Sequence, residues 1–171
     1  PQTHDLLAQP AQTILRDVQG WSCGASLLAA DLNGDGDDDL VVGCPDYGAL
    51  PGQSLGAVLA WYAPLPPGEI AISPAAASVA ILGGQNGERL GSAVAAGDWD
   101  GDGDLDILVG APGHDGSGRN DSGRAVLLAL DPTSATQLFD LASLPAPLPL
   151  DLRGGDGARL GESVAMADLD E

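Results

Sequence analysis

Two nine-residue segments of the chain follow one pattern, D-x-[DN]-x-D-G-x-x-D. They cover residues 31–39 and 98–106, and their first aspartates lie 67 residues apart. Oxygen-bearing side chains at positions one, three and five, with glycine at position six for a sharp turn, suit a hard cation such as Ca²⁺. Mg²⁺ prefers fewer ligands in a stricter geometry, and zinc prefers Cys or His, which both loops lack. We therefore expect both segments to bind Ca²⁺.

The expected ligands come from the two complete loops and from a third copy that begins near the end of the sequence. Side chains at positions one, three and five point inward, position seven usually offers its backbone carbonyl, and a carboxylate at position nine closes the shell. The third copy supplies only its first and third positions. The expected metal-ligating residues are Asp31, Asn33, Asp35, Asp37, Asp39, Asp98, Asp100, Asp102, Asp104, Asp106, Asp168 and Asp170.

The sequence after each loop separates these loops from the EF-hand. An EF-hand carries Glu at position twelve and lies between two helices, whereas position twelve here is Val42 or Val109. The apolar runs Leu40–Gly43 and Ile107–Gly110 follow the loops and end in Gly-x-Pro, which is typical of a strand and then a turn. The dockerin form of the loop fails for the same reason. Each loop is therefore expected to join two strands.

The loops belong to an internal repeat. Residues 23–31, 90–98 and 160–168 align, and the first aspartate of the third copy follows that of the second by 70 residues. Further apolar runs lie before and after these segments, so each unit offers about four short strands, the pattern of a β-propeller blade. The expected units are a first at about residues 12–74, a second at 75–148 and the start of a truncated third at 149–171.

A Leu-Gly or Cys-Gly start, the acidic loop and a Gly-Ala-Pro end resemble the FG-GAP repeat. Leu90-Gly91 and Gly110-Ala111-Pro112 match best, whereas the first unit departs with Cys23-Gly24 and Gly43-Cys44-Pro45. This repeat occurs in the propeller of integrin α subunits and in many secreted bacterial proteins, and we expect the secreted bacterial type. The resemblance covers nearly the whole chain from Thr13.

The resemblance implies an all-β fold of consecutive four-stranded antiparallel β-propeller-type blades. It also places Ca²⁺ in the hairpin between the first two strands of each blade. Since a closed propeller needs at least about four blades, the chain is expected to hold an incomplete propeller.

The two cysteines, Cys23 and Cys44, fall on either side of the first loop. Counting back from the loop ends, Ser26 is expected to face Cys44, with Cys23 beyond it. This register leaves both a disulfide and a pair of buried free thiols open. A disulfide that closes such a loop adds about 3 kcal/mol.

The charge of the chain restricts its partners. The net charge is −19, from 25 acidic residues, six arginines and no lysine. Nucleic acid and anionic membrane surfaces need a basic face, so neither is an expected partner. No segment is long and apolar enough for membrane insertion. Because extracellular calcium suits weak loops of this kind, a secreted, extracellular or cell-surface location is expected.

The other motifs give no catalytic constellation, and we expect no enzyme. Gly52–Gly56 fits the G-x-S-x-G nucleophile elbow, but an expected strand rather than a helix follows the serine. His4 and His114 are the only histidines, and His114 is expected in an exposed loop. Asn120-Asp-Ser122 is a candidate glycan-attachment site in an expected surface loop.

These observations predict a calcium-stabilised extracellular structural or adhesion module. Its expected partners are calcium and a protein, or a second copy that associates through the open blade edges. Two alternatives remain open. One is a protomer of an extracellular filament or shell, which the half-finished third unit favours. The other is a non-catalytic accessory domain of a larger secreted enzyme.

Overall fold

The computed structural model describes residues 13–48, 50–116, 118, 120–144 and 148–167 of the chain. Within these ranges the protein is all-β, and its one helix is the short 3₁₀ turn Pro74–Ala76. The expected fold class, consecutive blades of the propeller type with an incomplete closure, is confirmed. No helix in the described part of the chain has the length and apolar character to cross a membrane.

Two sheets contain four antiparallel strands each, and both repeat one order. Most of these strands are short runs rich in Val, Leu, Ile and Ala beside Gly, Pro or Asp, which suits a pleated surface. The first sheet consists of β2 (Ser26–Ala30), β3 (Asp39–Cys44), β4 (Ala57–Trp61) and β6 (Val79–Leu82). The second consists of β7 (Ala93–Gly97), β8 (Asp106–Ala111), β9 (Arg124–Leu128) and β11 (Leu150–Arg153).

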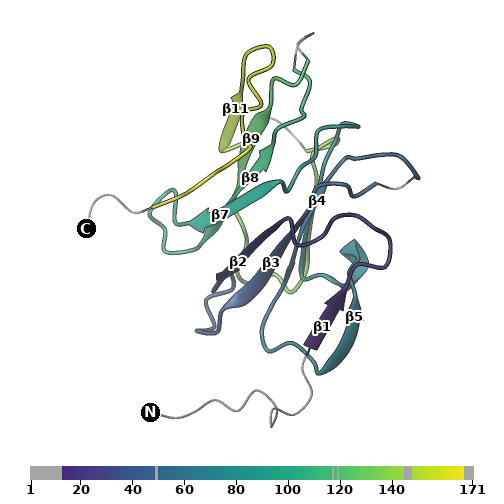
Figure 1. Cartoon of the computed structure of the whole chain (residues 1–171). Coiled ribbons are helices and arrows are strands. Elements are labelled where there is room, and N and C mark those ends of the chain that lie inside the picture. The colour runs from purple at the N-terminus through teal and green to yellow at the C-terminus, as the bar shows by residue number, and fades with distance from the viewer. Residues whose placement is uncertain (1–12, 49, 117, 119, 145–147, 168–171) are drawn as a thin grey trace, which may run out of the picture.

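The first sheet also has a fifth strand, which the sequence did not lead us to expect. β10 (Gln137–Asp140) lies between β9 and β11 in the chain, but it pairs in parallel with β6 of the first sheet. β5 (Gly68–Ala71) likewise pairs in parallel with β1 (Thr13–Arg16). Figure 1 shows β1 and β5 side by side and apart from the neighbouring sheet. The β1–β5 pair thus repeats the β6–β10 pair. In both, the later strand pairs in parallel with a strand that lies before the acidic loop of the same sequence unit.

The last antiparallel strand of each sheet comes from the next sequence unit. β6 lies in the segment that we placed at the start of the second unit, yet it pairs with β4 and completes the first sheet. β11 completes the second sheet in the same way by pairing with β9. The unit boundaries at residues 12–74, 75–148 and 149–171 therefore stay a prediction, and the sheets divide the chain differently.

The main core lies between the two sheets. Val58 and Ile81 of the first sheet pack against Val109 and Val126 of the second, and all four are at most 1% exposed. In Figure 1, β7 runs close to β2 and β3. Face-to-face packing this close requires small residues at the crossing points.

Two glycines allow this close approach. A Cβ added at Gly43 would lie 2.0 Å from the Gly91 carbonyl oxygen, and one at Gly110 would lie 2.0 Å from the Gly161 oxygen. The start of the third unit therefore packs on the second sheet as the second unit packs on the first. Parallel bridges at Gly56–Leu90 and Gly123–Leu160 repeat the same contact.

Candidate metal centres

Both acidic loops connect the first two strands of a sheet. The first joins β2 to β3 and the second joins β7 to β8, and both pairs are antiparallel. The last ladder partners are Ala30 with Asp39 and Gly97 with Asp106, so the two hairpins share one register. The expected strand–loop–strand arrangement is confirmed.

The first loop is held in shape by hydrogen bonds from its own backbone. Asp31 accepts from the N–H groups of Asp35 at 3.1 Å and Gly36 at 2.8 Å. Asn33 Oδ1 accepts from Asp35 N at 3.0 Å, and Asp35 Oδ1 accepts from Asp37 N at 2.9 Å. These bonds fix the side chains at positions one, three and five around the same turn.

The second loop repeats this network with a carboxylate at position three. Asp98 accepts from Gly101 N at 2.7 Å and Gly103 N at 2.9 Å, and Asp102 accepts from Asp104 N at 2.9 Å. One oxygen each of Asp98, Asp100 and Asp102 lies within 4.8 Å of the others. Three exposed carboxylates this close repel one another, and a hard cation is the group that relieves the repulsion.

Position nine differs from the other positions because its carboxylate is buried. Asp39 is 1% exposed and accepts from Leu32 N at 2.9 Å and Ala63 N at 2.8 Å. Asp106 is 6% exposed and accepts from Trp99 N at 3.0 Å. These side chains tie the start of each loop to the strand that follows it.

Burial raises the pKa of Asp39, and the nearby charges of Asp35 and Asp31 raise it further, against the hydrogen bonds from Ala63 and Leu32. Burial also raises the pKa of Asp106, and the carboxylates of Asp100, Asp102 and Asp98 add to this effect. In both loops the exposed carboxylates therefore act on the buried one as uncompensated negative charge.

The donor set fits calcium. The residues at positions one, three, five and nine offer only oxygen atoms, and the loop backbone adds carbonyl groups, which are the ligands of hard cations. Asp37 is exposed and Asp104 is half-buried, so neither position seven carboxylate is buried. Asp168 and Asp170 lie outside the described residues.

The cysteines form a disulfide, which settles the choice that the sequence left open. Cys23 and Cys44 are bridged with their Cα atoms 4.0 Å apart. The expected register was wrong by one residue, because Ser26 pairs with Gly43 rather than with Cys44. Cys23 still reaches its partner, since positive φ angles at Ser22 and Gly24 bend the chain just before β2.

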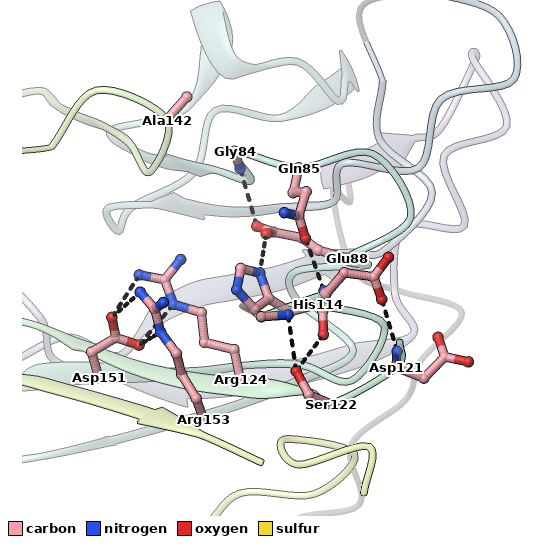
Figure 2. Close-up of polar contacts among 12 residues, drawn as sticks. Gly84, Gln85, Glu88, His114, Asp121, Ser122, Arg124, Ala142, Asp151 and Arg153 are labelled. Atoms are coloured by element: carbon pink, nitrogen blue, oxygen red, sulfur yellow. Dashed lines mark hydrogen bonds and ion pairs between the residues drawn. The ribbon is translucent and has the colours of Figure 1, made fainter. Parts of the chain in front are cut away.

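His114 is buried, so its expected exposure was wrong. It is 7% exposed, and its Nδ1 lies 2.9 Å from Oε2 of the fully buried Glu88. Glu88 Oε1 also accepts from Gly84 N at 3.0 Å. Figure 2 shows this pair, together with Arg124, Asp151 and Arg153. Glu88 and His114 align with Trp21 and Tyr47 of the first unit, and the structure shows that those two rings pack edge to face with centroids 4.7 Å apart.

The G-x-S-x-G match and the candidate glycan-attachment site both lie outside the strands. Ser54 of the G-x-S-x-G match lies in the loop between β3 and β4, as expected, and its N–H donates to Asn86 Oδ1 at 3.0 Å. Asn120 of the candidate glycan-attachment site is exposed, as expected for a surface loop. Ser122 of the same site is buried and donates to the His114 carbonyl at 2.9 Å.

The paired sheets and their acidic hairpins define an all-β protein built of propeller-type blades. The FG-GAP repeat family matches residues 24–66 and 90–128, which are the two segments that carry the loops. The chain therefore carries two FG-GAP repeats.

The curated relatives are much longer proteins. The chain is 36% identical over 106 residues to integrin alpha pat-2 of Caenorhabditis elegans, which covers 54% of this chain and 8% of that protein. It is 38% identical over 110 residues to phosphatidylinositol-glycan-specific phospholipase D of Rattus norvegicus, covering 62% of this chain and 13% of the relative. The human protein of that name is 40% identical over 97 residues, covering 54% and 11%.

Proposed function

We propose that this chain is a calcium-stabilised extracellular binding module built of FG-GAP blades. One observation carries the proposal: the same all-oxygen hairpin loop occurs at the same register in two sheets that pack on each other. The proposed ligands are Asp31, Asn33, Asp35, Asp37 and Asp39 in the first loop, and Asp98, Asp100, Asp102, Asp104 and Asp106 in the second. For Asp168 and Asp170 the support is the sequence repeat alone.

Bound Ca²⁺ would supply positive charge to a cluster of like-charged carboxylates. The side chains of the loop then hold the hairpin in shape. The side chains at positions one, three and five hold the turn, and the buried Asp39 and Asp106 join it to the sheet. A loop ordered in this way fixes the first two strands of each blade, and the blade surfaces are left for recognition of a protein partner.

The extracellular location and the non-catalytic role are part of the same proposal. The Cys23–Cys44 disulfide supports an oxidising compartment. The matched part of an integrin alpha chain supports an adhesion or binding role. The matches to phosphatidylinositol-glycan-specific phospholipase D support the alternative of an accessory domain beside a hydrolase in a longer secreted protein. Glycan attachment at Asn120 belongs to the proposal as well.

Calcium titration of two variants of one loop tests the metal site. Asp35→Ala removes a proposed ligand at position five, and Asp38→Ala removes the same charge from position eight, which is exposed and is not a proposed ligand. We expect Asp35→Ala to weaken calcium binding at its loop roughly tenfold or more, and to reduce the rise in melting temperature on adding Ca²⁺.

Calorimetry and thermal denaturation, with and without chelator, give the two measurements. We expect Asp38→Ala to resemble the parent chain in both. If the two variants weakened calcium binding equally, the effect would come from net charge rather than from ligation. If calcium did not change the melting temperature of the parent chain, the proposed stabilisation by calcium would be wrong.

Self-association is a second candidate, which a particular strand favours. β1 pairs in parallel with β5 as β6 pairs in parallel with β10. β6 also has an antiparallel neighbour, β4, whereas among the described residues β1 has no second neighbour. A free strand edge of this kind accepts a strand from another copy. Light scattering at saturating Ca²⁺ and again with chelator measures the mass. A calcium-dependent oligomer would support assembly as the function, and a monomer in both conditions would exclude it.

A further inference from the structure

A cavity of about 660 Å³ opens between the outer strands of the two sheets. One wall comes from the β6–β7 connection, with Glu88, and from the turn after β10, with Leu141 and Ala142. The opposite wall comes from β9 and β11, with Arg124 and Asp151. In Figure 2 the His114 ring lies between Glu88 and the guanidinium groups of Arg124 and Arg153. The volume is within the usual range for a small-molecule site.

The charged residues of this cavity replace apolar residues of the first unit. Glu88 and His114 stand where the first unit has Trp21 and Tyr47. The pairing of β9 with β11 matches that of β4 with β6, since Arg124 pairs with Arg153 as Ala57 pairs with Leu82. By the same register Asp151 replaces Ala80. The first-unit residues Ala57 and Ala80 are buried in an apolar cluster, against which Trp21, Tyr47 and Leu82 pack. The second unit therefore has an open cavity with ionisable side chains where the first has packed apolar side chains.

These charges are unusually well buried. Arg124 and His114 are each 7% exposed and Glu88 is fully buried. Charged groups are almost never found at this depth unless they are paired. A packed apolar cluster serves the same position in the first unit, so packing alone does not require charged residues here.

In this cavity the two arginine side chains have more hydrogen-bond donors than their bonds to Asp151 use. Asp151 accepts from Nε and Nη2 of Arg124 and from Nε and Nη2 of Arg153, at 2.8–3.3 Å. Glu88 accepts from Gly84 N and His114 Nδ1. Each guanidinium has five N–H donors, of which these bonds use two. Both carboxylates are thus engaged, and each guanidinium keeps unused cationic donors.

We propose that this cavity binds a small ligand with one carboxylate and a short apolar body. The guanidinium groups of Arg124 and Arg153 donate to the ligand carboxylate, a charge-assisted bond of the stronger kind. Leu141, Leu144, Leu148 and Leu150 line the cavity and contact the apolar body. The proposal is independent of calcium, because none of these residues belongs to an acidic loop.

Calorimetric titration of the whole chain with octanoate, phenylacetate and the neutral octanamide tests the proposal. We expect at least one carboxylate to bind saturably, with a Kd of about 1 mM or tighter, and octanoate to bind about tenfold more tightly than octanamide. Arg153→Gln should weaken carboxylate binding about tenfold. This arginine is half-exposed, and Asp151 keeps Arg124 as a partner, so the variant should fold. Arg16→Gln removes an exposed cation elsewhere and is the matched control.

A second variant locates the binding. Ala142 is an exposed residue of the cavity wall, so Ala142→Trp fills the opening without changing charge. We expect this variant to lose carboxylate binding while keeping the melting temperature of the parent. The proposal is overturned if neither carboxylate binds saturably, if octanamide binds as well as octanoate, or if Ala142→Trp binds the carboxylate like the parent chain.

Discussion

At the scale of single residues, the aspartates of this protein have different roles according to their position. The loop aspartates at positions one and five accept hydrogen bonds from the turn and are exposed or half-buried, whereas Asp39 is buried under two backbone donors. Outside the loops, Asp151 joins two arginines. The number of acidic residues therefore says little about stability, because the contribution of each residue depends on which donors surround its carboxylate.

Asp151 gives a pH dependence that can be worked out from its surroundings. Partial burial acts to raise its pKa, but the hydrogen bonds and charges of Arg153 and Arg124 outweigh it, so the pKa lies below the ordinary 3.8. A carboxyl group whose pKa is lowered by folding stabilises the protein above its unfolded-state pKa. That contribution is lost as the pH falls through the lower folded-state value.

We therefore expect Asp151→Asn to lower the free energy of unfolding by about 1 kcal/mol at pH 7. The difference from the parent chain should begin to shrink as the pH falls below about 4, the unfolded-state pKa, and should vanish below the lower folded-state pKa. Urea denaturation at pH 7, 5 and 3, with chelator present, measures it. A difference that stayed constant across this range would show that Asp151 acts by packing rather than by charge.

At the scale of strands, the sequence predicted what local pattern controls. The two hairpins and their loops follow from apolar runs beside an Asp/Gly turn, and the expected runs Leu40–Gly43 and Ile107–Gly110 fall within β3 and β8. The parallel strand β10 was not expected, because residues 137–140 pair with residues 79–82, far away in the chain. Nothing local in Gln137–Asp140 distinguishes a strand of its own sheet from a strand of the neighbouring one.

The candidate sites show the same limit. The loop ligands could be named from spacing alone, because positions one to nine are neighbours in sequence. The partner of His114 could not, since Glu88 comes from a different connection and the contact depends on how two sheets meet. Aligning the two units sets Glu88 and His114 against Trp21 and Tyr47, but the contact within each pair is seen only in the structure.

The disulfide gives a prediction for the first hairpin. It encloses a sequence separation of 21 residues, and a loop of this size corresponds to about 3 kcal/mol in the chain-entropy model. We expect Cys23→Ser with Cys44→Ala to lower the free energy of unfolding by about this amount, Ala being the residue at the matching position 111. Denaturation with and without dithiothreitol checks it: the parent chain should respond to the reductant and the double variant should not. A parent chain insensitive to reduction would contradict this.

At the scale of the whole molecule, charge and strand exchange act against each other. A net charge of −19 on 171 residues favours expansion through self-repulsion. The structure opposes it by linking neighbours: β10 joins the first sheet, and the start of the third unit packs on the second at Gly110 and Gly161. Stability of this module should therefore depend on cations more strongly than that of a protein with balanced charge.

This balance gives the last prediction, on salt. With chelator present, raising sodium chloride from about 0.05 to 0.5 M shortens the Debye length from roughly 14 to 4 Å, which screens the loop carboxylates from one another. We expect the melting temperature to rise by several degrees. With saturating Ca²⁺ the same change of salt should have a smaller effect, because the clustered charges at Asp98, Asp100 and Asp102 are already neutralised. Thermal denaturation followed by circular dichroism measures both series, with potassium chloride as the control for a sodium-specific effect. Equal salt dependence with and without calcium would mean that the self-repulsion is spread over the surface and does not reside in the loops.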